Sequence, residues 1–151
     1  MPPARLLPTA DDTRAWGQAL GRALRAGDLV VLTGGLGAGK TTLTQGIGEG
    51  LGVRGPITSP TFVIARVHPS LVGGPALVHV DAYRLGGLAE LDALDLDESL
   101  DDCVTVVEWG HDIAEGLAEN YLEITLAGDT ERSATVDGHG LRWVGVDSTL
   151  G

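Results

Sequence analysis

The sequence predicts an α/β fold in which a mixed, mostly parallel sheet is flanked by helices. Two short and continuously apolar runs, LVVLT at 29–33 and CVTVVEW at 103–109, are typical of strands buried on both faces of a parallel sheet. The segments before and after the first run have helical periodicity, whereas the last third of the chain alternates between apolar and polar residues. A C-terminal antiparallel meander is therefore expected to extend the sheet.

The first predicted element is an amphipathic helix at 11–26. Trp16 and Leu20 fall on one stripe, acidic residues begin the segment and Gly27 follows it, as helix polarity favours. A second helix is predicted at 41–51 although it contains three glycines, each of which costs up to about 1 kcal/mol relative to alanine. Its propensity is poor, so tertiary packing must hold this helix.

The middle of the chain contains a predicted hairpin. Residues 60–68 and 76–85 are rich in β-formers and are separated by PSLVGGP, so the two runs are expected to pair antiparallel. Short helices are expected at 88–102 and 111–119. Three alternating runs then make the meander, namely YLEITLAG, RSATVDG and LRWVGV.

Length and composition limit the classes of function. The 151 residues have the size of one ordinary domain, and no linker or repeat divides them, so residues 1–151 are predicted to form a single domain. No apolar run approaches the roughly 20 residues that span a bilayer, and the N-terminal residues lack the apolar core of a secretory signal. The single cysteine, Cys103, is expected to be a small core residue, and a reducing cytoplasm fits best.

Charge limits the partners. The chain has 10 basic and 21 acidic residues, a formal net charge of −11. This charge repels a phosphate backbone within about one Debye length, so independent binding of DNA or tRNA is disfavoured. If the protein acts on nucleic acid at all, we expect another chain to hold it, although the acidity taken alone is better explained by solubility.

One motif indicates a chemistry. The segment GGLGAGKTT at 34–42 meets the pattern G-x-x-x-x-G-K-[ST] through Gly34, Gly39, Lys40 and Thr41, between a predicted strand and a predicted helix. Backbone N–H groups that cradle a triphosphate need glycines with permissive φ angles, and the positive end of the following helix faces the phosphates. Lys40, the only lysine, would reach the β- and γ-phosphates, and the Thr41 hydroxyl would bind Mg²⁺.

This motif narrows the fold class to a P-loop NTPase-like three-layer sandwich. ATP is favoured over GTP, because a guanine-reading N-K-x-D loop would need a second lysine. The predicted nucleotide-binding residues of the loop are Gly35, Leu36, Gly37, Ala38, Gly39, Lys40, Thr41 and Thr42.

Hydrolysis needs further groups from the ends of neighbouring strands. Asp81 ends the run ALVHVD and Glu108 ends CVTVVE, so both are expected at the sheet edge of the P-loop, where they would ligate Mg²⁺ or orient the attacking water. Thr61, in SPTF, could offer its hydroxyl to the γ-phosphate or the metal. Lys40, Asp81, Glu108 and Thr61 are therefore the predicted catalytic residues, and Thr41, Asp81 and Glu108 the predicted metal ligands.

Four motifs together resemble one family. In this order, GGLGAGKTT, TSPTF, HVDAYRL and VVEWG are similar to motifs of the bacterial TsaE family, also called YjeE, over roughly residues 8–135. The resemblance implies an ATPase that works with TsaB and TsaD in the threonylcarbamoyl modification of the adenosine beside the tRNA anticodon. The transfer chemistry would belong to TsaD, and ATP hydrolysis would keep the complex turning over.

The resemblance also implies roles for single residues. Asp81 takes a Walker B-like position, and Trp109 is a switch aromatic or, equally, a core residue. Arg132 resembles a family arginine near the nucleotide base, with a plain surface arginine as the alternative, and residues 9–13 would border the adenine. The chain departs from the family where Gly35 replaces the common Asp, and in a long hairpin insert, HPSLVGGPA, that is expected at the surface.

Two other interpretations stay open: a P-loop small-molecule kinase, and a non-catalytic module in which nucleotide only shifts conformation. A kinase usually closes a lid that carries several arginines, whereas the nine arginines here are scattered. For the ATPase, the only internal candidate for an arginine finger is Arg84, which packing explains better. We therefore expect slow hydrolysis by the chain alone and faster hydrolysis with its partners.

Overall fold

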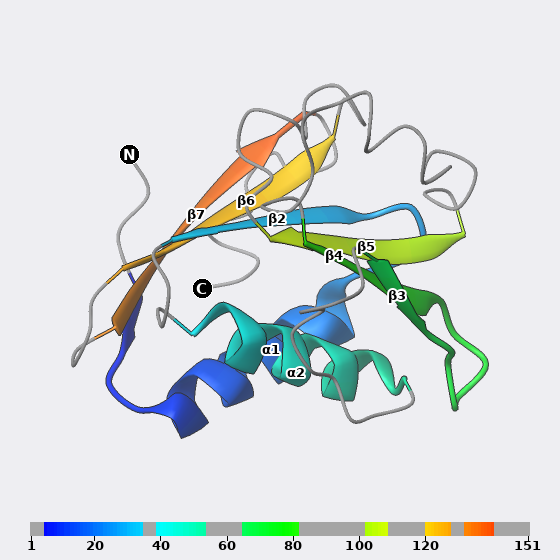
Figure 1. The fold of residues 1–151 in the computed structure, drawn as a ribbon, viewed down its shortest axis with the longest axis horizontal. Helices are drawn as coiled ribbons and strands as arrows, with labels where there is room; N and C mark the ends of the chain where they lie inside the picture. Colours follow the sequence, from blue (N-terminus) through cyan, green and yellow to red (C-terminus); the bar gives the residue numbers. More distant parts are fainter. Residues whose placement is uncertain are drawn as a thin grey trace.

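The computed structural model describes residues 5–34, 39–53, 65–81, 102–108, 120–127 and 132–140. Within these ranges, seven strands form one sheet in the order β1-β7-β6-β2-β5-β4-β3, and two helices pack against it (Figure 1). The elements are β1 (Arg5–Leu7), α1 (Ala10–Ala23), β2 (Leu29–Gly34), α2 (Lys40–Leu51), β3 (Ala65–His68), β4 (Ala76–Asp81), β5 (Cys103–Glu108), β6 (Tyr121–Ala127) and β7 (Arg132–His139).

The sheet is mixed with a parallel centre. Strands β6, β2, β5 and β4 run parallel to one another, while β3 is antiparallel to β4 and β7 is antiparallel to β6. These pairings confirm the predicted α/β class, the hairpin and the first two runs of the meander. The third predicted run, at 141–146, lies outside the described residues.

A strand that the sequence analysis did not predict closes one side of the sheet. β1 pairs antiparallel with β7. Its three residues are too few to show an alternating pattern and stand among prolines, which explains why the pattern was missed. The alternation is nevertheless real, because Leu7 is buried in the core whereas Leu6 is exposed.

Both faces of the central strands are buried, as predicted for β2 and β5. The face that carries Val30, Leu32 and Val106 packs against α1 and α2, which lie on the same side of the sheet in Figure 1. On the other face Val31 and Val107 are also fully buried. The helices predicted at 88–102 and 111–119 lie outside the described residues, and no described helix is long and apolar enough to cross a membrane.

Helix α1 begins at a capping box and ends earlier than predicted. The Thr9 hydroxyl accepts from the Asp12 N–H at 3.1 Å, and the Asp12 carboxylate accepts from the Thr9 N–H at 3.1 Å. The predicted end at residue 26 was wrong, because Leu24 is already extended. The turn that follows is held by Asp28, whose carboxylate accepts from the Arg25 N–H at 2.7 Å.

Two pairs of glycines explain why α2 forms despite its composition. Gly17 and Gly21 of α1 face Gly46 and Gly50 of α2, and a Cβ on any of the four would lie within 2.5 Å of a carbonyl oxygen on the other helix. We call these four residues the glycine seam. The seam lets the two backbones touch, and this close packing offsets the low helix propensity of α2.

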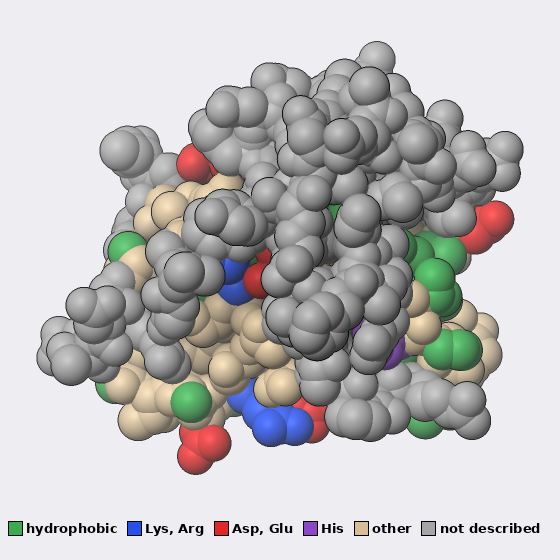
Figure 2. Space-filling model, in the orientation of Figure 1, with side chains coloured by type: hydrophobic (Ala, Val, Ile, Leu, Met, Phe, Trp, Pro, Cys, Tyr) green, Lys and Arg blue, Asp and Glu red, His purple; other side chains and the backbone are tan. Residues whose placement is uncertain are grey.

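The β3–β4 turn is folded against the C-terminal end of α2. The Leu71 N–H donates to the Gly52 carbonyl at 2.8 Å, and Val53 forms an isolated bridge with Ser70. The turn is exposed, as expected for the insert. Hydrophobic side chains gather at the right of Figure 2, and the exposed apolar residues of β3 and its turn are Val67, Leu71 and Val72.

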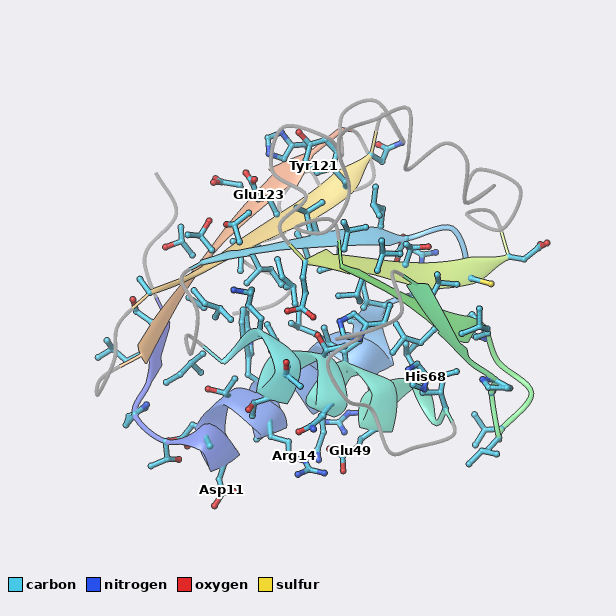
Figure 3. All side chains as sticks on the ribbon, viewed as in Figure 1. Asp11, Arg14, Glu49, His68, Tyr121 and Glu123 are labelled. Carbon is cyan, nitrogen blue, oxygen red and sulfur yellow. The ribbon has the colours of Figure 1, made fainter. Side chains whose placement is uncertain are left out.

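An ion pair at the surface of the two helices predicts a dependence of stability on pH. Arg14 Nε and Nη2 donate to the two carboxylate oxygens of Glu49 at 2.5 and 3.1 Å (Figure 3). Hydrogen bonding by Arg14 lowers the pKa of Glu49 from its ordinary value of 4.5. The pair therefore stabilises the fold above that value and stops doing so as the pH falls through the lowered pKa.

We expect wild type and Glu49→Gln to differ slightly in urea midpoint at about pH 7 and to converge at about pH 2. The gap should be small and should shrink with added salt, because both side chains are more than 40% exposed. A gap that persists at low pH would show that the carboxylate charge is not its cause.

Candidate functional site

The predicted P-loop joins β2 to α2 at the edge of the sheet. β2 ends at Gly34 and α2 begins at Lys40, with Gly39 as its N-cap in the left-handed region at φ 99°. The Gly39 carbonyl accepts the first helical hydrogen bond, from the Leu43 N–H at 2.9 Å. The intervening residues Gly35, Leu36, Gly37 and Ala38 lie outside the described residues.

Gly34 is required by both its backbone and its surroundings. Its φ angle is 143°, and an added Cβ would lie 2.4 Å from the Leu126 carbonyl oxygen of β6. The first glycine of the motif is therefore needed because the end of β2 lies in backbone contact with β6.

Lys40 bridges the two ends of the loop. Its side chain is buried, and its Nζ donates to the Gly34 carbonyl at 2.9 Å. The ammonium thus lies at the N-terminal end of α2, where the helix dipole favours anions and where a phosphate would need a compact cation. Thr41 and Thr42 follow in the first turn and are partly exposed.

The backbone brings the two predicted acids to the same place. In the β4–β5 ladder Asp81 is the register partner of Glu108, and in the β2–β5 ladder Glu108 is the partner of Leu32, two residues before Gly34. The ends of β4, β5 and β2 therefore meet at the edge where the P-loop begins. The side chain of Asp81 and all of Thr61 and Trp109 lie outside what the structure describes.

Glu108 has a partner that the sequence analysis did not identify. His79 Nε2 lies 2.5 Å from Glu108 Oε2, and both side chains are buried. In the sequence His79 is the first residue of the HVDAYRL motif, two residues before Asp81, which puts both residues on the same face of β4.

Arg132 and the start of α1 reach the same edge of the sheet. Arg132 is the register partner of Leu7, two residues before the N-cap Thr9. β7 begins beside the end of β6, where Leu126 pairs with Gly34. The backbone thus places the two segments that the resemblance assigns to the adenine near the first glycine of the loop; the Arg132 side chain lies outside the described set.

The donors at this edge suit a hard cation. The hydroxyl of Thr41 and the carboxylate of Glu108 supply oxygen only, and Mg²⁺ is usually held by one or two such protein ligands together with phosphate oxygens and water. No group of three or more described His, Cys, Asp or Glu side chains is arranged as a complete metal cage. The donor set therefore fits a magnesium ion that arrives with a phosphate ligand.

A family model and two named relatives point to one family. The family model for the threonylcarbamoyl adenosine biosynthesis protein TsaE matches residues 7–136. A Streptomyces coelicolor protein named tRNA threonylcarbamoyladenosine biosynthesis protein TsaE is 62% identical over 144 residues, which cover 91% of this chain and 97% of its own. A Bacillus subtilis protein of the same name is 39% identical over 136 residues, which cover 88% of this chain and 84% of its own. The crystal structure of Bacillus subtilis YdiB is similar with a TM-score of 0.75 at 34% identity, covering 98% of this chain and 93% of that one.

Proposed function

Because the chain belongs to the TsaE family of threonylcarbamoyl adenosine biosynthesis proteins, we propose that it is the ATP-binding and ATP-hydrolysing subunit of that tRNA modification. The observation that carries the proposal is the strand–loop–helix at 29–51. There Gly34 tolerates no side chain, Gly39 caps α2, and the buried Lys40 ammonium joins both ends of the loop.

The roles of Thr41, Asp81, Glu108 and Arg132 are proposed from their backbone positions at this edge, and that of Thr61 from the SPTF motif of the sequence. Mg²⁺ would be held by the Thr41 hydroxyl and by the carboxylates of Asp81 or Glu108, and it would neutralise charge on the phosphates. The acid that does not ligate the metal would orient the attacking water. Thr61 would contact the γ-phosphate, and Arg132 would border the base. Catalysis would then consist mostly of positioning and charge neutralisation.

We propose that the chain works in the cytoplasm with TsaB and TsaD, and that tRNA is held by that complex. The net charge of −11 supports indirect contact with tRNA. The test is ATP turnover measured with and without TsaB and TsaD, and we expect slow turnover alone and a several-fold increase in the complex. Equal rates would contradict stimulation by partners, and no calorimetric binding of ATP with Mg²⁺ would contradict the proposal as a whole.

A further inference from the structure

The contact between His79 and Glu108 has no role in the function proposed so far. His79 is fully buried, and only 6% of the Glu108 side chain is exposed. A buried carboxylate is costly unless it is hydrogen-bonded, and a buried imidazole equally needs a partner. Each of the two residues therefore depends on the other.

The register explains how they meet. His79 is the Cα partner of Val106 in the parallel β4–β5 ladder, and Glu108 is two residues farther along β5. Residues two apart share a face, so both side chains project from the same face and meet diagonally. The same register makes Asp81 the partner of Glu108. The contact between His79 and Glu108 therefore lies next to the sheet edge where the metal site is predicted.

The atoms involved fix the direction of the hydrogen bond. A carboxylate offers only acceptors, so His79 donates from Nε2 to Glu108 Oε2. His79 Nδ1 is buried, and no described residue pairs with it, which fits the tautomer with its lone pair on Nδ1. The bond uses Oε2 of Glu108, so the carboxylate keeps a second oxygen, Oε1, with which it could meet a metal ion or a water.

On the basis of the proposed ATPase function, we propose that His79 is a positioning residue that holds the Glu108 carboxylate in a single orientation for hydrolysis. His79 touches neither nucleotide nor water itself and acts through Glu108. Groups that orient a ligand or base in this way typically change activity by about 10- to 100-fold when removed. Substrate binding depends on the P-loop, so it should be nearly unaffected.

The test compares two amides at position 79. His79→Gln can place its Nε2 close to the position of the imidazole Nε2, whereas the amide nitrogen of His79→Asn lies nearer to Nδ1 and does not reach Glu108. We expect His79→Asn to lower kcat for ATP by about 10- to 100-fold with KM within about threefold, and His79→Gln to recover most of the loss. Calorimetric titration with ATP and Mg²⁺ should give the same Kd for all three proteins, within about threefold.

His68 provides a matched control. It is also a buried histidine, near the end of β3 (Figure 3), and is not part of the site. His68→Asn should lower the thermal midpoint as a buried substitution does and leave kcat unchanged. Equal kcat values for His79→Gln and His79→Asn, or an equal loss in His68→Asn, would overturn the inference.

A fourth variant, Glu108→Gln, separates this inference from the proposed function. If Glu108→Gln lowers kcat and His79→Asn does not, the positioning role alone fails. If wild type neither binds nor hydrolyses ATP, the proposed function fails. If Glu108→Gln hydrolyses ATP at the wild-type rate, Glu108 has no role in hydrolysis and the inference about His79 fails with it.

Discussion

Lys40→Met is expected to lower kcat/KM for ATP hydrolysis by at least about 10²- to 10³-fold, the usual cost of removing a group that stabilises transition-state charge. Methionine keeps the length and apolar stem of lysine and removes only the ammonium. Steady-state turnover and calorimetric ATP binding, both measured with Mg²⁺, check the prediction.

The structure gives this expectation a specific physical reason. The Lys40 ammonium donates to the Gly34 carbonyl at 2.9 Å, so the cation is already held at the mouth of the loop by the residue that begins it. Burial makes a cation more effective toward an incoming phosphate, because the local dielectric constant is lower than in water. Lys40→Arg should restore little activity, since a planar guanidinium does not fit where a compact ammonium is needed.

Arg22→Met is the matched control for Lys40→Met. Arg22 is exposed in the last turn of α1, so its loss changes the net charge by the same amount without touching the loop. It should leave kcat/KM unchanged. Wild-type turnover in Lys40→Met, with an intact thermal transition, would contradict the assignment of a phosphate-binding loop.

The sequence predicted those parts of the fold whose signals are local. Continuous apolar runs identified β2 and β5 because strands of a parallel sheet are buried on both faces. Glycine and lysine spacing identified the loop because its chemistry demands those residue types. By contrast, β1 is held by its pairing with β7, and the end of α1 is set by the turn at Asp28, so neither has a strong signal of its own.

In the candidate site, too, residues with a local sequence signal were predicted, and a residue placed by tertiary contacts was not. Asp81 and Glu108 could be selected because each acid directly follows an apolar run. The role of His79 could not be predicted, because its contact with Glu108 depends on the register between strands that are far apart in sequence. The HVDAYRL motif includes this histidine but does not indicate its partner until that register is known.

The glycine seam lowers the helix propensity of α2, and the reason for its glycines is the close packing of α2 on α1. Substitutions in the seam have the largest expected effect on stability. Helix propensity alone predicts that Gly46→Ala should stabilise α2 by up to about 1 kcal/mol. Packing predicts the opposite, because a Cβ at Gly46 would lie 2.2 Å from the Arg14 carbonyl oxygen and 3.0 Å from Gly17 Cα. Both of these atoms belong to the backbone, so the helices themselves would have to move apart.

We expect the packing clash to outweigh the gain in helix propensity. Gly46→Ala should then destabilise the fold by about 1–3 kcal/mol, the usual cost of overpacking a core. For a domain of this size that loss corresponds to a fall in Tm of roughly 3–10 °C. Thermal and urea unfolding measure it. ATP affinity should fall as well, because α2 carries Lys40 at its first residue and any shift of the helix moves the ammonium.

Gly74→Ala is the control, since it makes the same substitution in an exposed turn where the nearest atom, Ser70 Oγ, is 3.8 Å away. Its effect should be close to zero. Gly50→Ala should behave like Gly46→Ala, because its Cβ would lie 2.2 Å from the Gln18 carbonyl oxygen. If Gly46→Ala were as stable as Gly74→Ala, the helices would not be in backbone contact, and the stability of α2 would need another source.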